Sequence, residues 1–247
     1  MEVHHHPDLH HKQKKFKEFF LEFIMIFLAV TLGFIAENVR ESISDHGKEK
    51  EYVKSLINNL QDDTAIMRMV IKENTRKLDT LTLLQYLYAA DFSKPENVSL
   101  LYRHCSMIGY YSIFKSNDAT MMQLKTSGLQ FIRRDHVADS IAAYDNSTKI
   151  IYASEDLYIK ATDEALMATQ QLIDYSVAND STNNNTDGTL NNVTLPLYID
   201  DKTSLPHFFN KVDFEVGGTV NYINNINRVL PYAERLITYL KKEYDLD

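Results

Sequence analysis

The sequence predicts an all-α protein, with one N-terminal transmembrane helix followed by a long-helix antiparallel bundle domain. Three observations predict this fold class. Residues 19–36 read FFLEFIMIFLAVTLGFIA, which is eighteen residues with no proline and a single charge, Glu22. An apolar pattern with heptad-like spacing follows over residues 53–88. The 247-residue chain contains only 7 glycines and 5 prolines, the two residues that disfavour helix interiors.

The chain is expected to divide into three parts. Residues 1–18 form a cytoplasmic tail rich in His and Lys, residues 19–36 form the transmembrane helix, and residues 37–247 form a helical domain with a polar loop at 179–192. An eighteen-residue helix is about 27 Å long, close to the hydrocarbon thickness of a bilayer. The part beyond the span is long enough to bury a core of its own.

The charges on either side of the span predict its orientation. Basic residues precede the span and acidic residues follow it, so the positive-inside rule places the N-terminus in the cytoplasm and the large domain across the membrane. A cleaved signal peptide is the alternative, and Glu22 within the apolar stretch and Phe34 near its end both weigh against it. The residues that set the charge bias are Lys12, Lys14, Lys15 and Lys17 before the span, and Glu37, Glu41 and Asp45 after it.

One face of the span predicts that this helix packs against another helix, in the first instance its own copy. Small residues allow close approach in lipid, and a carboxylate within a span requires a polar environment. The alternative is a single helix in which Glu22 reaches back to water. The residues of the predicted transmembrane packing face are Glu22, Ile26, Ala29, Gly33 and Glu37.

The first eleven residues contain five histidines. Neutral imidazoles bind zinc, nickel or copper, but a flexible terminus offers no fixed geometry, so we expect no functional metal site there. Protonated in mild acid, the same histidines would strengthen contact with anionic lipid.

The long periodic segment predicts a helical seam of about ten turns. Its spacing suits packing on other helices of the same chain as well as an intermolecular coiled coil, and both arrangements stay open. The seam residues are Val53, Ile57, Leu60, Met67, Ile71, Asn74, Leu78 and Leu81, with Thr64 and Gln85 as further polar members.

Residues outside the seam predict further helices separated by turns. A break is expected at Asp45–Gly47, an irregular region at 193–215, and a kink or division at Pro231. Gly128 is expected to end a short helix. The expected helices are 97–114, 119–127, 135–177 with a weak point at 146–148, and 219–244.

Charge and motif content exclude several functions. The net charge is −8, and residues 1–18 carry +1 of it, so nonspecific nucleic-acid binding by the large domain is not expected. The single cysteine, Cys105, excludes an internal disulfide and a cysteine-built zinc site. Phosphate loops, dinucleotide fingerprints and hydrolase motifs are absent from the sequence. We therefore expect no enzyme, and no catalytic, cofactor-binding or metal residues.

Several chemically capable side chains receive ordinary structural interpretations. His104 and Cys105 diverge by about 100° on a helix and are expected to be packed residues. The adjacent acidic pairs Asp62–Asp63 and Glu155–Asp156, and the basic pair Arg133–Arg134, are expected to lie on the solvated surface.

Three parts of the chain resemble a family of short single-pass membrane proteins from Bacteroidota. They are the lysine-rich start with the span that follows, the segment 119–132 (ATMMQLKTSGLQFI), and the segment 139–144 (DSIAAY). Many members end the span with Asn-Asn-Trp, where this chain has Asn38-Val39-Arg40. The family carries no established activity. The resemblance implies a bacterial inner-membrane anchor and a periplasmic domain.

Three functions from different classes fit these observations. The favoured one is a non-enzymatic structural or accessory protein, a homo-oligomer whose periplasmic helical bundle binds or braces other membrane or periplasmic proteins. The second is a helical-bundle sensor of a periplasmic ligand. The third is an ion or proton path lined by Glu22.

Overall fold

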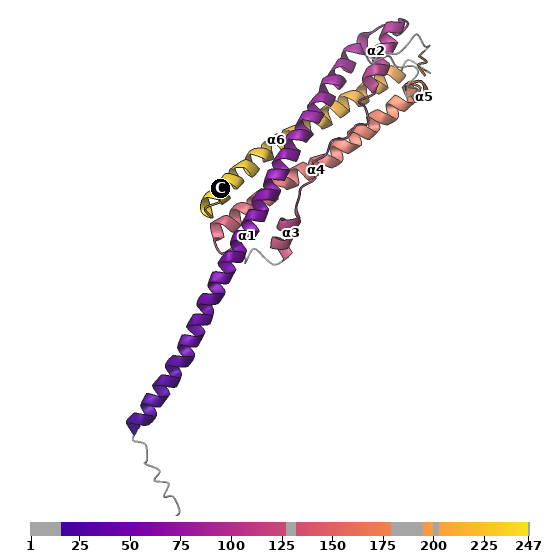
Figure 1. The fold of residues 1–247 in the computed structure, drawn as a ribbon. Helices are drawn as coiled ribbons and strands as arrows, with labels where there is room; N and C mark the ends of the chain where they lie inside the picture. Colours follow the sequence, from indigo (N-terminus) through magenta and orange to yellow (C-terminus); the bar gives the residue numbers. More distant parts are fainter. Residues whose placement is uncertain (1–15, 127–131, 179–194, 200–202, 247) are drawn as a thin grey trace, which may run out of the picture. The chain divides into compact units, whose positions relative to one another are not determined.

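The structure is a computed structural model that describes residues 16–126, 132–178, 195–199 and 203–246, and its described part is all-α (Figure 1). Residues 1–15 of the expected tail 1–18, the cap at Gly128 and the whole of the expected loop at 179–192 lie outside these residues. The helices are α1 (Phe16–Tyr86), the 3-10 turn η1 (Leu87–Ala89), α2 (Pro95–Cys105), α3 (Ala119–Thr126), α4 (Asp135–Leu172), α5 (Tyr175–Ala178) and α6 (Ser204–Glu243).

The chain forms two compact units, Met1–Glu51 and Tyr52–Asp247. In the first unit, the break predicted at Asp45–Gly47 is wrong, because these residues lie inside α1. A single glycine costs a helix only about 1 kcal/mol. The ion pair of Lys48 Nζ with Asp45 Oδ1, at 3.3 Å, spans this turn.

In the second unit, α1 and α4 run in the same direction. Asp63 contacts Tyr144, and farther along both helices Lys77 contacts Thr162. Residues with higher numbers on α1 therefore meet residues with higher numbers on α4. The predicted antiparallel arrangement therefore does not hold for α1 and α4. After α2, residues 106–118 run back along the bundle, so that α4 starts near the same end as the bundle part of α1 (Figure 1).

Helix α6 runs antiparallel to both α1 and α4. Residue numbers along α6 fall as those along α1 and α4 rise, so α6 has the predicted antiparallel arrangement. The contacts that show this are Arg68–Glu234 and Gln85–Asp213 with α1, and Arg134–Glu243 and Glu164–Lys211 with α4.

The buried face of α1 follows a heptad spacing that differs slightly from the predicted seam. The buried positions alternate steps of three and four residues, and each is at most 2% exposed. Ile71 and Leu78 of the predicted seam lie at the edge of this face and are only half-buried. The buried positions are Val53, Leu56, Leu60, Asp63, Met67, Val70, Asn74, Lys77, Leu81 and Leu84.

Helix α6 has a buried stripe of the same kind, which explains why it begins at Ser204 rather than near 219. The prediction of irregular structure up to residue 215 is wrong, because Phe208 and Val212 continue the stripe and Pro206 sits in the first turn, where its missing N–H is harmless. Pro231 lies inside α6 and does not divide it. The stripe is Phe208, Val212, Glu215, Thr219, Tyr222, Ile226, Val229, Ala233, Leu236 and Leu240.

The predicted helix 135–177 is two helices, because Ile173 and Asp174 leave the helical conformation. Ile173 forms an isolated antiparallel bridge with Leu197. The Asp174 carboxylate accepts from the Ser176 backbone N–H at 2.8 Å, which caps α5. The weak point expected at 146–148 lies within unbroken α4.

Residues 110–117 are extended, which corrects the predicted helix over 97–114. Helix α2 ends at Cys105, and Gly109 turns the chain with φ +87°, a value that favours glycine. Beyond it the side chains alternate, with Ser112 and Phe114 buried and Lys115 exposed. A period of two is that of a strand, although these residues pair with helices rather than with another strand.

The core of the bundle is divided into two apolar clusters by a layer of polar side chains. One cluster includes Met67, Val70 and Tyr222, and the other includes Leu81 and Val212. Between them lie the buried polar residues Asn74, Lys77, Thr162, Glu215 and Thr219.

Candidate functional site

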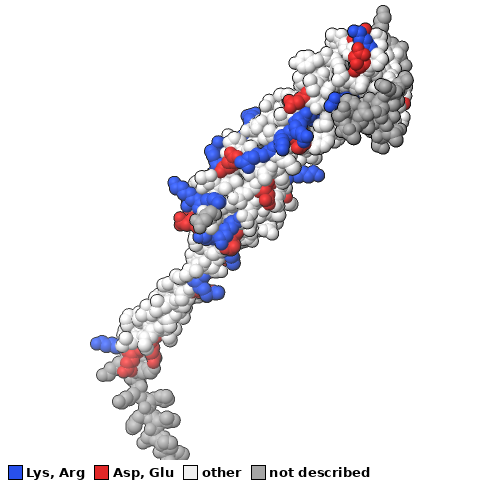
Figure 2. All heavy atoms as spheres, turned by 45° about the horizontal axis from the view of Figure 1, so that its top comes forward, with Lys and Arg blue, Asp and Glu red and all other residues white. Residues whose placement is uncertain are grey.

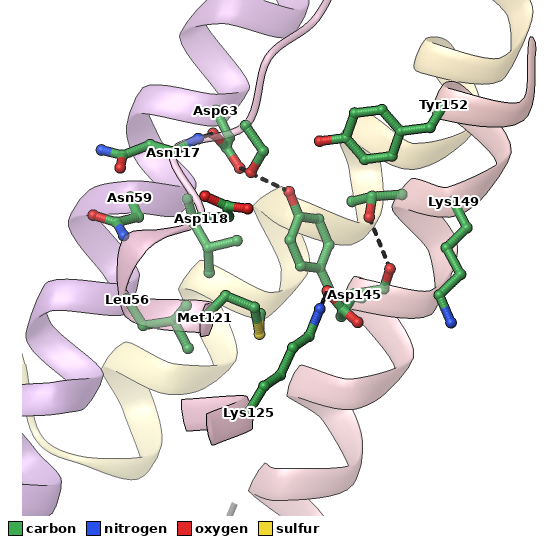
Figure 3. Close-up of a pocket in the computed structure, with 14 residues that line it drawn as sticks. Leu56, Asn59, Asp63, Asn117, Asp118, Met121, Lys125, Asp145, Lys149 and Tyr152 are labelled. Atoms are coloured by element: carbon green, nitrogen blue, oxygen red, sulfur yellow. Dashed lines mark hydrogen bonds and ion pairs between the residues drawn. The ribbon is translucent and has the colours of Figure 1, made fainter. Parts of the chain in front are cut away.

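A cavity of about 270 Å³ opens between α1, α3, α4 and the extended segment (Figure 3). It lies within the second unit. Apolar side chains form part of its wall, and carboxylates, amides, hydroxyls and two lysines form the rest. Its lining residues are Leu56, Asn59, Leu60, Asp63, Ser116, Asn117, Asp118, Met121, Lys125, Tyr144, Asp145, Thr148, Lys149 and Tyr152.

Asp63 is the most buried charge of this cavity, at 2% exposed. Its carboxylate accepts hydrogen bonds from Ser116 Oγ at 2.6 Å, from the Asn117 backbone N–H at 2.7 Å, and from Tyr144 Oη at 3.3 Å. Burial raises the pKa of Asp63. The three donors lower it and the neighbouring Asp62 raises it, each by less than burial does. The expectation that Asp63 lies on the solvated surface is therefore wrong, whereas Asp62 is exposed.

The remaining charges of the cavity are unevenly compensated. Lys125 Nζ pairs with Asp145 Oδ1 at 2.6 Å. Lys149 Nζ donates to the side-chain amide oxygen of Asn146 at 3.1 Å, and in Figure 3 it points away from Asp118. In the described part of the chain, the buried Asp63 and the exposed Asp118 form no ion pair, so neither carboxylate of this wall has a countercharge there.

The polar layer of the core is a second group of buried titratable side chains. Lys77 Nζ lies 2.7 Å from Glu215 Oε1 and donates to Tyr110 O and to Thr162 Oγ1, both at 2.9 Å. Burial lowers the pKa of Lys77 and raises that of Glu215, and each charge opposes the shift of the other. The ring of Tyr158 lies 4.8 Å from Lys77 Nζ. Neither residue lines the cavity beside Asp63 or the cavities beside Tyr239 and His207, in keeping with a structural role for the pair.

The side chains of this layer also satisfy the backbone of the extended segment. Asn74 Nδ2 donates to Ser112 O at 2.7 Å, and the Phe114 N–H donates to Tyr222 Oη at 2.8 Å. Tyr158 Oη accepts from the Ser112 N–H at 3.3 Å and donates to Asn74 Oδ1 at 2.7 Å. Buried peptide groups require such partners, so the layer holds the segment in place.

The predicted transmembrane packing face lies on the first part of α1. Ile26 is 66% exposed, and a Cβ added at Gly33 would meet no atom within 4 Å. Glu37 pairs with Arg40 one turn along the same helix. Ala29 is exposed and Glu22 is half-buried. Ile26, Ala29 and Gly33 are therefore exposed in the single chain.

The predicted helical seam lies in the chain's own core. Val53, Ile57, Leu60, Met67, Asn74 and Leu81 are at most 4% exposed and pack against residues of α4, α6 or the extended segment.

Other residues singled out in the sequence have structural positions. Cys105 is 1% exposed in the second apolar cluster and His104 is half-buried, so the two are packed as expected. Arg134 binds Glu243 and stacks on the Tyr244 ring at 4.8 Å, so it is not simply solvated. Among the described residues, no group of three or more His, Cys, Asp or Glu could hold a metal ion.

Sequence reasoning missed Asp63, Lys77 and Glu215. All three occupy buried heptad positions, so their spacing was the signal that could have located them. Charged residues are rarely buried, so the predicted seam includes the neighbouring Thr64 and Leu78 in place of Asp63 and Lys77.

Comparisons with protein-family models, curated proteins and solved structures gave no match.

Proposed function

We propose that this chain is a membrane-anchored, homo-oligomeric structural or accessory protein whose periplasmic helical bundle binds or braces partner proteins. The observation that carries the proposal is the first part of α1. It is long and apolar enough to cross a membrane, a property that signal sequences share. Figure 2 shows it as a nearly uncharged surface, whereas acidic and basic side chains are interspersed over the bundle.

The exposure of this apolar stretch supports an anchor. Its large apolar side chains from Phe19 to Val39 are 50–69% exposed in the single chain, apart from Ile24, which is half-buried. Soluble proteins seldom leave so much contiguous apolar surface in water, and lipid or another helix would cover it. The bundle in turn has its own core, so it does not need the apolar stretch for its stability.

A homo-oligomer is supported by the character of the packing face. Ala29 and Gly33 offer a small surface for close approach, and Glu22 supplies a polar group that copies of the helix can share. The inner-membrane location and the periplasmic bundle rest on the lysines before the span and on the resemblance to the Bacteroidota family.

The test of the anchor is alkaline extraction of membranes from cells that express the full chain. We expect the protein to stay in the membrane pellet at its uncleaved mass. Replacing Phe27 and Val30 with lysine should release it, whereas lysine at the exposed bundle positions Met69 and Leu83 should not. Release of the unaltered chain, or a mass that shows cleavage near residue 36, would overturn the anchor. Crosslinking in native membranes followed by mass spectrometry would identify the partners.

A sensor is the second candidate function, and the cavity beside Asp63 favours it. A sensor requires a ligand site between helices, and this cavity lies between α1, α3 and α4.

A further inference from the structure

The buried carboxylate of Asp63 forms no ion pair with any residue that the structure describes. It is 2% exposed, and its three partners are a hydroxyl, a backbone N–H and a phenol, all of them neutral. A buried charge is costly unless it is paired. A carboxylate has about four acceptor sites, so three donors leave it room for one more. The cavity is the space from which a further donor can approach.

The surroundings of Asp63 favour a positively charged ligand. Asp118 adds a second carboxylate that forms no ion pair in the described part of the chain. Of the two lysines that line the cavity, Lys125 pairs with Asp145, and Lys149 donates to the side-chain amide of Asn146. In Figure 3, Asp63, Asp118 and Asn59 lie on one side of the cavity.

The size and the walls of the cavity favour an organic cation over a metal ion. A volume of about 270 Å³ is far larger than a single ion or water, which occupies about 30 Å³ in the liquid. Leu56, Leu60 and Met121 supply apolar walls, and the rings of Tyr144 and Tyr152 offer faces that attract cations. Among the described residues, no set of ligands suits a metal ion.

We propose that this cavity binds a small organic ammonium ion, with Asp63 and Asp118 as its countercharges and its apolar part against Leu56, Leu60 and Met121. The ammonium group would donate to the carboxylates, and the tyrosine rings would flank it. The proposal rests on the cavity alone and does not depend on the membrane anchor.

The test uses the full chain in detergent with benzylamine as the probe and benzyl alcohol as its neutral counterpart. Benzylamine should raise the thermal midpoint in a concentration-dependent manner, since a ligand that binds only the folded state stabilises it. Benzyl alcohol should leave it unchanged. Asp118→Asn should weaken benzylamine binding, measured by calorimetry, by about tenfold or more, because it removes a charge-assisted contact. Asp118 directly precedes α3, and its carbonyl oxygen accepts from the Met122 N–H at 2.7 Å. Asparagine keeps that backbone contact and also caps helices, so this variant tests the site without removing a contact of Asp63.

The matched control is Asp79→Asn, which removes the same charge from an exposed position of α1 outside the cavity. It should leave binding unchanged. Equal stabilisation by benzyl alcohol, unaltered binding in Asp118→Asn, or a Ca²⁺-dependent stabilisation that Asp118→Asn abolishes would each overturn the proposal. The anchor is tested separately by membrane extraction, so failure here leaves that result untouched.

Discussion

The side-chain nitrogen of Lys77 lies 2.7 Å from Oε1 of Glu215, and neither side chain is accessible to solvent. The two residues come from α1 and α6, and they lie between two apolar clusters. An isolated charge at this depth would be strongly destabilising, so each residue depends on the other. The pair therefore ties the register of α1 to that of α6.

This pair should show strong coupling in a double-mutant cycle. Lys77→Met or Glu215→Leu alone should lower the free energy of unfolding by about 3–5 kcal/mol, because each leaves a buried charge unpaired. The double variant should lose less than either single variant. In both variants that lack Lys77, Tyr110 O loses the shorter of its two hydrogen bonds and keeps the one from Tyr158 Oη at 3.4 Å. Chemical denaturation of the full chain in detergent measures the four values. Additive losses would show that the two charges do not stabilise each other.

Tyr222→Phe should weaken the attachment of the extended segment. The Phe114 N–H donates to Tyr222 Oη at 2.8 Å, and removal of that oxygen leaves the amide buried without this acceptor, at a cost of about 1–3 kcal/mol. Hydrogen exchange at Phe114 should accelerate accordingly. Tyr232→Phe, at a tyrosine that is 52% exposed, is the control and should change neither value. An unchanged exchange rate at Phe114 in Tyr222→Phe would contradict this assignment.

Stability should depend on pH through Asp63. Burial raises the pKa of its carboxyl in the folded state, against Ser116, Asn117 and Tyr144, which lower it. The folded protein therefore binds the proton more tightly than the unfolded chain. The resulting stabilisation is complete below the unfolded pKa of about 3.9 and is lost as the pH rises through the folded value.

The measurement compares the full chain with Asp63→Asn by urea denaturation at pH 4 and pH 7. The free energy of unfolding of the unaltered chain, relative to the variant, should be lower at pH 7 than at pH 4. Asp62→Asn, at the exposed neighbouring carboxylate, should show a much smaller dependence. A relative stability that rises with pH would mean that the pKa of Asp63 is depressed instead.

Cys105 should be unreactive in the folded protein. It is 1% exposed, and burial raises the pKa of its thiol well above the usual value, with Glu215 adding to the effect. The thiolate is the reactive form, so a disulfide reagent should modify Cys105 only as fast as the bundle opens. The rate of modification in buffer and in denaturant gives the comparison. Rapid stoichiometric modification without denaturant would show that this cluster is accessible.

The packing face of the span should govern self-association. Ala29→Leu with Gly33→Leu would block close approach of two helices and should reduce crosslinked oligomers in membranes several-fold. Val30→Leu, a small change on another face, is the matched control. Equal crosslinking in all three proteins would mean that copies of this helix do not meet through Ala29 and Gly33.

The sequence predicted the helical class and the apolar span well, because both rest on periodicity and composition over many residues. It predicted the conformation of individual segments less well where tertiary contacts determine that conformation. Residues 110–117 became extended because side chains of three helices provide partners for their peptide groups. The N-terminal part of α6 was missed because Pro206 and the glycines near 217 resemble loop signals, although Phe208, Val212 and Glu215 keep the buried spacing.

The candidate site could be predicted only in part. Asp63 and Lys77 are ordinary surface residues by composition, and only their places in the pattern 60-63-67-70-74-77 indicate burial. The cavity itself joins α1 to residues 116–125 and 144–152, which are far apart in the sequence. No periodicity within one helix reveals which distant residues share a pocket.

The extended segment has a consequence for how the helices align during folding. Heptad-patterned helices can shift by one repeat, about 10.5 Å, and still bury apolar side chains. Here such a shift would carry Asn74, Tyr158 or Tyr222 away from the peptide groups at 110–114 that they serve. In a wrongly aligned bundle, buried peptide groups would lack hydrogen-bond partners. The thirteen residues between α2 and α3 therefore favour a single alignment of the helices.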